Sequence, residues 1–173
     1  MRKFILLLLF VLVNVALPAQ NLSLAQLLEI KKKDLGNAIE YLTLEGWEFF
    51  EAEAPTNGGL GKVTFSYNKS ALSSTADSFF IYYYTSFPDM TWISIQVSKI
   101  NKYNEYINSI KEYGCELIST EVKEGRILKE YKGENMTFLV EIGKTTNHFD
   151  EETAVWHLWV FSTADYDLIW GVK

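Results

Sequence analysis

The sequence has one cysteine, Cys115, and two histidines, His148 and His157, among its 173 residues. A single cysteine excludes an intramolecular disulfide, so the fold must depend on a hydrophobic core. The H-E-x-x-H, C-x-x-C and G-x-S-x-G spacings of zinc hydrolases, thiol oxidoreductases and serine hydrolases are absent. We therefore predict no catalytic residue, no metal ligand and no cofactor. A hydrolase that uses one of the two histidines is kept as the least favoured hypothesis.

Basic residues are also scarce. The chain has 16 Lys and Arg against 22 Asp and Glu, which gives a formal net charge of −6. Nucleic acids and anionic membranes attract dense basic patches, and the one lysine run, Lys31 to Lys33, lies in a segment with helical periodicity. Nucleic acid is therefore not an expected partner.

Long apolar runs are limited to the amino terminus. Basic residues precede the run Phe4 to Leu17, and small residues near Ala19 follow it, which is the layout of a secretory signal peptide. The run contains Asn14 and is shorter than the roughly 20 apolar residues that span a bilayer. We therefore expect a signal peptide over residues 1–19, export to the periplasm or the extracellular space, and a soluble mature protein without a stable membrane anchor.

Two stretches of the chain pass from a predicted helix through a glycine into a predicted strand. In residues 103–122, tyrosines and isoleucines recur at helical spacing, Gly114 ends the helix, and β-branched residues follow. Residues 41–53 show the same order around Gly46. Each stretch is followed by three more segments of strand character, at 62–67, 79–85 and 92–99 in the first half and at 126–132, 136–142 and 155–162 in the second.

The first helical segment begins at a capping box formed by Ser23 and Gln26. A second helix-start signal follows at Asp34. This signal either divides the segment into two helices or only kinks it, and the sequence leaves both alternatives open.

These segments predict an α+β fold built from two tandem helix-plus-four-strand repeats, residues 20–99 and 100–173, in one compact domain. Trp92 and Trp156 match at an offset of 64 residues, whereas the helix-ending glycines are 68 apart. Because each unit has an apolar helix face and alternating strands, the helices should pack on one face of an antiparallel sheet. Whether the two units share one sheet is left open.

This order of elements resembles the β-lactamase-inhibitor-protein fold, in which tandem repeats of a helix and four strands form one curved sheet. The resemblance covers nearly the whole mature chain, but only at the level of element order. The disulfides of that family cannot form here, since Cys115 has no partner. The resemblance implies a protein-binding surface.

The face of the sheet that the helices leave open is where we expect a binding site. In the strand at residues 92–97, Ile93 and Ile95 are assigned to the core, which turns Trp92 outward. The residues assigned to the open face are Phe80, Tyr82, Tyr84 and Trp92, with Phe79, Ile81 and Tyr83 on the core side. An aromatic surface of this kind has the composition of a binding patch, although aromatic pairs on solvated strands also stabilise sheets without binding anything.

Trp156 joins this candidate site through its match to Trp92. That match turns His157 inward and leaves Leu158 and Val160 facing water, unless the segment 166–170 covers them. The orientation of the last strand is therefore left open.

The leading hypothesis is an exported, non-catalytic binding or inhibitor-like module that uses the aromatic open face on a protein partner. The alternative is a carrier that holds a small apolar ligand among the same aromatic residues, between the helices and the sheet.

Overall fold

The computed structural model describes residues 22–56, 59–70, 75–86, 89–146 and 152–171. The predicted signal peptide, residues 1–19, and His148 lie outside these residues. The helices are α2 (Leu24–Lys31), α3 (Leu35–Leu44), α4 (Ile100–Glu112) and α5 (Thr163–Trp170). The strands are β1 (Glu48–Glu53), β2 (Leu60–Tyr67), β3 (Ser78–Thr85), β4 (Thr91–Val97), β5 (Glu116–Lys123), β6 (Arg126–Lys132), β7 (Met136–Thr146) and β8 (Glu152–Ser162).

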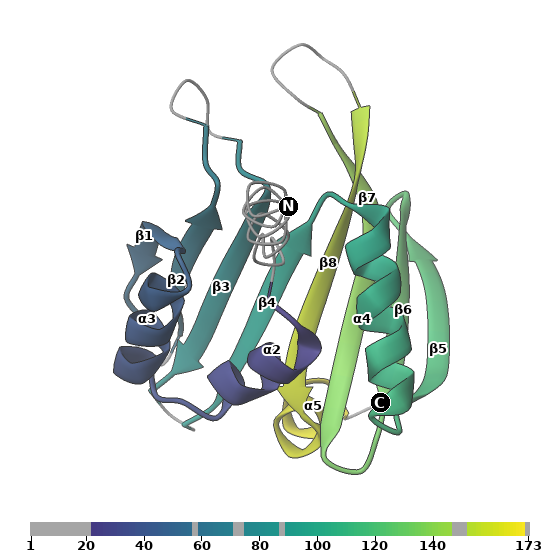
Figure 1. The fold of residues 1–173 in the computed structure, drawn as a ribbon. Coiled ribbons are helices and arrows are strands. Elements are labelled where there is room, and N and C mark those ends of the chain that lie inside the picture. The colour runs from purple at the N-terminus through teal and green to yellow at the C-terminus, as the bar shows by residue number, and fades with distance from the viewer. Residues whose placement is uncertain (1–21, 57–58, 71–74, 87–88, 147–151, 172–173) are drawn as a thin grey trace, which may run out of the picture.

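All eight strands form one antiparallel sheet in the order β1-β2-β3-β4-β8-β7-β6-β5. Each half of the chain contributes a four-stranded meander, and the pairing of β4 with β8 joins the two meanders (Figure 1). The α+β class and the antiparallel sheet are thereby confirmed, and the two halves share one sheet. The duplication of the sequence stays a prediction.

Helices α2, α3 and α4 cover one face of this sheet (Figure 1). The main core lies between them and the strands, and it draws residues from both halves of the chain. Its fully buried members include Leu27, Ile30, Leu42, Phe65, Phe80, Ile93, Ile95, Ile110, Phe138 and Val160.

The first helical segment is divided into two helices, which decides the alternative that the sequence left open. Ser23 and Gln26 form the predicted capping box at the start of α2. Asp34 then accepts a hydrogen bond from the backbone nitrogen of Asn37 at 2.8 Å and caps a new helix. Side chains that satisfy the free N–H groups of a first turn favour a helix start at that point.

Helix α5 packs on the opposite face of the sheet, which we call the open face. There Trp92, Phe161 and Tyr166 form a second, smaller core. Lys31 of α2 connects the two layers, because its Nζ lies 3.6 Å from Oδ2 of Asp165 and its side chain is only 12% exposed. Burial lowers the pKa of Lys31, and the nearby Asp165 opposes that shift.

No helix within the described residues has both the length and the apolar character that a bilayer span requires.

Candidate functional site

The open face is hollowed along its middle by an apolar depression of about 350 Å³, which we call the aromatic groove. Trp92 of β4 and Trp159 and Phe161 of β8 line it from the two central strands. Leu60 of β2 and Tyr83 of β3 line one side, Leu128 of β6 and Leu139 of β7 line the other, and Trp170 of α5 lines it as well. Glu141 is the single charged residue among its lining residues.

The groove exists because the sheet is curved. Leu60 and Leu128 line the same groove although four strands separate β2 from β6 in the sheet. In a flat sheet these strands would lie roughly 24 Å apart, at about 4.8 Å per strand. The open face is therefore concave.

Stacked aromatic rings form the surface of the groove near α5. Tyr83 stacks on Trp92 with a centroid distance of 5.4 Å and an interplanar angle of 15°. The ring of Trp170 lies 5.0 Å from that of Phe161 and 6.4 Å from that of Trp92. Trp92 is consequently buried, whereas Trp170 is 44% exposed.

A polar depression of about 140 Å³, the histidine hollow, adjoins the groove and shares Glu141 with it. His157 lines this hollow and stacks on Trp159 at 5.5 Å. Arg126 donates a hydrogen bond to Glu141 at 2.8 Å beside it. Burial lowers the pKa of His157, Arg126 lowers it further, and Glu141 opposes both.

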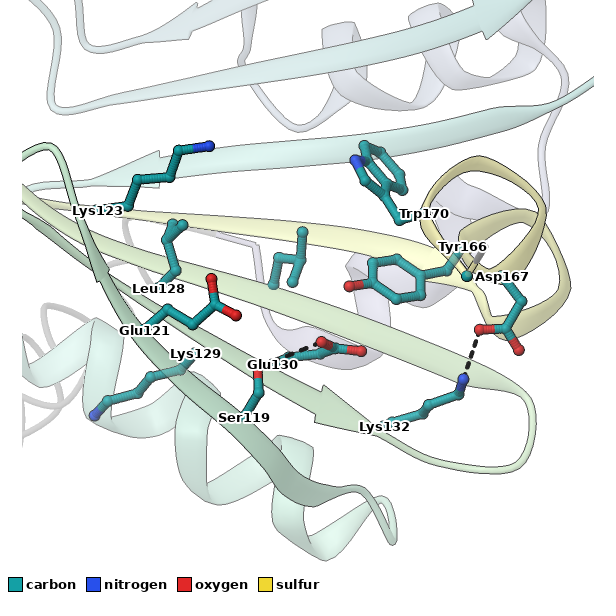
Figure 2. A pocket seen from close by; sticks show the side chains of 12 residues that line it. Ser119, Glu121, Lys123, Leu128, Lys129, Glu130, Lys132, Tyr166, Asp167 and Trp170 are labelled. Atoms are coloured by element: carbon teal, nitrogen blue, oxygen red, sulfur yellow. Dashed lines mark hydrogen bonds and ion pairs between the residues drawn. The ribbon is translucent and has the colours of Figure 1, made fainter. Parts of the chain in front are cut away.

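A larger depression of about 530 Å³, the Tyr166 cleft, adjoins the groove near α5 and shares Leu128, Leu139 and Trp170 with it. Figure 2 shows Glu121 and Glu130 projecting from β5 and β6, and the Tyr166 ring projecting toward them from α5. The three depressions together form one continuous concave surface.

Carboxylates surround the Tyr166 hydroxyl group. The pKa of Tyr166 is raised to about 12. Burial is the largest cause, Glu130 is the next, and Asp167 and Glu121 make smaller contributions. Negative neighbours disfavour a phenolate, so the side chain stays a neutral phenol under physiological conditions.

The predicted assignment of Phe80, Tyr82 and Tyr84 to the open face is wrong. Phe80 is 0% and Tyr82 1% exposed in the main core, and Tyr84 packs against that core. Tyr82 donates its hydroxyl to the carbonyl oxygen of Lys33 at 2.9 Å, on the helix side. Tyr83, assigned to the core, lines the aromatic groove instead.

The reason lies in the register of β3. Its residues are apolar or aromatic from Phe79 to Tyr84, so polarity does not distinguish its two faces. Tyr82 pairs with Ile93, and directly opposed residues of an antiparallel pair share a face. Once Ile93 is placed in the core, the register places Tyr82 there as well.

Of the two tryptophans predicted on the open face, Trp92 lies there but is buried beneath α5. Trp156 lies on the helix side, where it stacks on Tyr103 of α4 at 5.7 Å. Ile93 pairs with Val160, and Ile95 pairs with Leu158. The two pairs are therefore equivalent if each β4 residue corresponds to the β8 residue 65 positions later, not 64. A shift of one residue reverses the faces of a strand.

Sequence reasoning missed the groove residues Leu60, Leu128, Leu139, Trp159 and Trp170. The alternation of His157, Trp159 and Phe161 along the last strand was a usable signal, because it sets an aromatic row against Leu158 and Val160. The contribution of α5 had no comparable local signal.

The described residues offer little for catalysis. They contain no group of three or more His, Cys, Asp or Glu side chains arranged to hold a metal ion. Cys115 is buried in the main core, where burial raises the pKa of its thiol. His157 lies on the opposite side of the sheet from Cys115, so the two cannot act as a nucleophile and its base.

Comparisons of this chain with protein-family models, with curated proteins and with solved structures gave no match.

Proposed function

We propose that the protein is an exported, non-catalytic binding module whose open face binds an extended segment of a protein partner. The observation that supports this best is that the aromatic groove shares lining residues with two neighbouring depressions that are lined by charged side chains. An apolar centre surrounded by polar groups is the usual composition of a protein–protein interface.

The exposed apolar surface of the groove gives a partner something to bury. Leu60 and Trp170 are each 44% exposed, and Trp159, which lines the same groove, is half-buried. Fully burying a large apolar side chain contributes about 1.5–3 kcal/mol, and aromatic residues recur among the strongest interface contacts. These three side chains are therefore the expected anchors.

Within the described residues, large aromatic side chains occupy much of the layer between the helices and the sheet, where we expected an apolar ligand. Phe80, Tyr82 and Tyr106 are each 2% exposed or less. The Tyr106 hydroxyl donates to the carbonyl oxygen of Leu22, as Tyr82 does to Lys33. A ligand held there would have to displace core side chains, which favours a site on the open face.

Affinity capture from the exported fraction of the source organism tests this proposal. Residues 20–173 are compared as wild type and as the double variant Leu60→Ala, Trp159→Ala. A protein partner should be retained by the wild type and lost from the variant. The matched control is Ile39→Ala, Leu44→Ala, which removes exposed apolar side chains from α3 on the other side of the sheet.

Equal retention by the wild type and the groove variant would reject the open face as the binding site. Circular dichroism melting of all three proteins shows whether each variant is folded, so a loss of capture is interpreted only for a folded variant.

A carrier of a small apolar ligand is the second candidate, because the aromatic groove has a nearly apolar lining and a volume typical of small-molecule sites. Native mass spectrometry of the purified protein distinguishes the two. A carrier should retain a small adduct that Trp159→Ala abolishes, whereas a protein-binding module should show the mass of the polypeptide alone.

A further inference from the structure

We propose that partner binding in the aromatic groove depends on pH through His157, whose neutral form favours the bound state. This inference rests on the proposed function and adds a regulation of the same site. The His157 ring stacks on the Trp159 ring with a centroid distance of 5.5 Å and an interplanar angle of 20°. Because Trp159 is one of the expected anchors, the histidine hollow continues the surface that a partner covers.

His157 lies in the middle of a polar row that crosses the sheet. It pairs with Gln96 of β4 on one side and with Glu141 of β7 on the other. Directly opposed residues of antiparallel strands share a face, so all three side chains belong to the open face. Since Glu141 also lines the aromatic groove, this row borders the apolar surface.

The charges around His157 do not favour a second cation. The charged residues that line the histidine hollow are Arg126, Glu141 and Lys144. Arg126 donates a hydrogen bond to Glu141 at 2.8 Å, and Lys144 forms an ion pair with Glu152. A proton on His157 therefore adds a positive charge beside a carboxylate that already has a cationic partner.

A bound partner would also take water away from His157. His157 and Trp159 are both half-buried in the free protein. An apolar side chain seated on Trp159 excludes water from the adjoining imidazole ring, and loss of water disfavours the charged form of a histidine. The pKa of His157 is already lowered in the free protein, mainly by burial, and the partner should lower it further.

The sign of the pH dependence follows from linkage. If the partner lowers the pKa of His157, protonation of His157 must weaken the partner to the same degree. Affinity is then highest above the pKa of the free protein and falls as the pH drops through that value. A pKa difference of one between the free and bound states corresponds to about tenfold in affinity.

A peptide without titrating groups is the probe. Phage-displayed random heptapeptides are selected at about pH 7.5 on immobilised residues 20–173, and one is chosen that Trp159→Ala fails to retain. The chosen peptide contains no His, Asp, Glu or Cys and is synthesised with an acetylated amino end and an amidated carboxyl end. Any pH dependence of its affinity near neutrality then comes from the protein.

For the wild type, the dissociation constant of this peptide should be about threefold larger at about pH 5 than at about pH 7.5. His157→Gln should bring this ratio close to one. Because the ratio is taken within each protein, a change in affinity common to both pH values cancels. His148→Gln, which removes the other histidine of the chain, is the matched control and should keep the wild-type ratio. Circular dichroism melting at both pH values shows that each protein is folded.

Titration of the wild type by nuclear magnetic resonance measures the pKa of His157 directly and does not depend on a folded His157 variant. The two histidine ring signals are distinguished with His148→Gln, and the pKa of His157 should be lower with the peptide bound. An equal affinity at both pH values, a ratio that persists in His157→Gln, or a pKa that the peptide leaves unchanged would overturn the inference and leave the proposed function standing. Failure to select any Trp159-dependent peptide would overturn both.

Discussion

Two buried tyrosines hold helix α2 at its two ends. The Tyr106 hydroxyl of α4 donates to the carbonyl oxygen of Leu22, just before α2, at 2.5 Å. The Tyr82 hydroxyl of β3 donates to the carbonyl oxygen of Lys33, just after α2, at 2.9 Å. The pKa of each phenol is raised, and burial is the largest cause in both cases. Each side chain thus satisfies a backbone acceptor that the helix itself leaves free.

Tyr106→Phe should lower the free energy of unfolding by about 1–3 kcal/mol, because it leaves the buried Leu22 carbonyl without its donor. Urea denaturation followed by circular dichroism measures the change. Tyr113→Phe, which alters a ring that is 50% exposed, is the control and should shift stability by less than about 0.5 kcal/mol. Equal effects of the two substitutions would contradict a specific role for the buried hydrogen bond.

His157 should make stability fall in mildly acidic solution. Burial is the largest cause of its lowered pKa in the folded protein, so the unfolded chain binds a proton first as pH falls. The contribution of His157 to the free energy of unfolding is complete above its pKa in the unfolded chain, about 6.5. It decreases as the pH drops through that value toward the pKa in the folded protein.

Unfolding free energies of the wild type and His157→Gln, measured from about pH 8 to about pH 5, isolate this contribution. The difference between the two proteins should change with pH in this window, with the wild type losing more stability. Parallel curves would show that His157 has the same pKa in both states.

Among the secondary-structure elements, α3 and α4 end in the same way. Gly46 and Gly114 have φ angles of 82° and 90°, in the region that favours glycine. The next residue in each case donates its backbone N–H to the carbonyl five residues back, Trp47 to Leu42 and Cys115 to Ile110. This is the Schellman arrangement, and it turns the chain from the helix directly into an edge strand.

Gly114→Ala should destabilise the protein by about 1–2 kcal/mol, the conformational cost of a left-handed alanine. A Cβ at this position meets no atom within 4 Å, so steric overlap adds nothing. Gly114→Asn should cost less, because asparagine tolerates this region better. Thermal unfolding of the two variants beside the wild type provides the comparison, and equal losses would indicate a cause other than backbone conformation.

The two edge strands carry features that oppose pairing with another chain. The register of β1 shifts between Phe49 and Glu51, and that of β5 shifts between Leu117 and Ser119. Strand β1 also carries three glutamates and β5 carries two. Bulges and charges at exposed edges are common protections against edge-to-edge association.

At the scale of the whole molecule, the two halves depend on one core. The main core combines residues of α2 and β2–β4 with residues of α4 and β6–β8, and β4 pairs with β8 along the seam. The ion pair between Lys31 and Asp165 joins α2 to α5. Neither half can bury its apolar surface alone.

We therefore expect one cooperative unfolding transition, with the same midpoint by far-ultraviolet circular dichroism and by tryptophan fluorescence. The fragments 20–99 and 100–173, prepared separately, should lack cooperative transitions. Two separate transitions in the intact protein, or a folded isolated half, would contradict the single core.

Local chemistry in the sequence was enough to determine the types of the elements before α5, the helix boundaries at Ser23, Gly46 and Gly114, and the α+β class. Capping groups, positive-φ glycines and the change from helical to alternating periodicity act within a few residues. The same local signals placed Ile93 and Ile95 in the core, because their neighbours on β4 include polar side chains.

Only the tertiary structure decided which faces of β3 and β8 are buried. Strand β3 is apolar on both sides, and the face of Tyr82 follows from its pairing with Ile93. The Tyr166 cleft combines β5, β6 and β7 with a helix from the end of the chain. Register and long-range packing bring these distant residues together, and no local pattern encodes either, because each depends on the energy of the whole sheet.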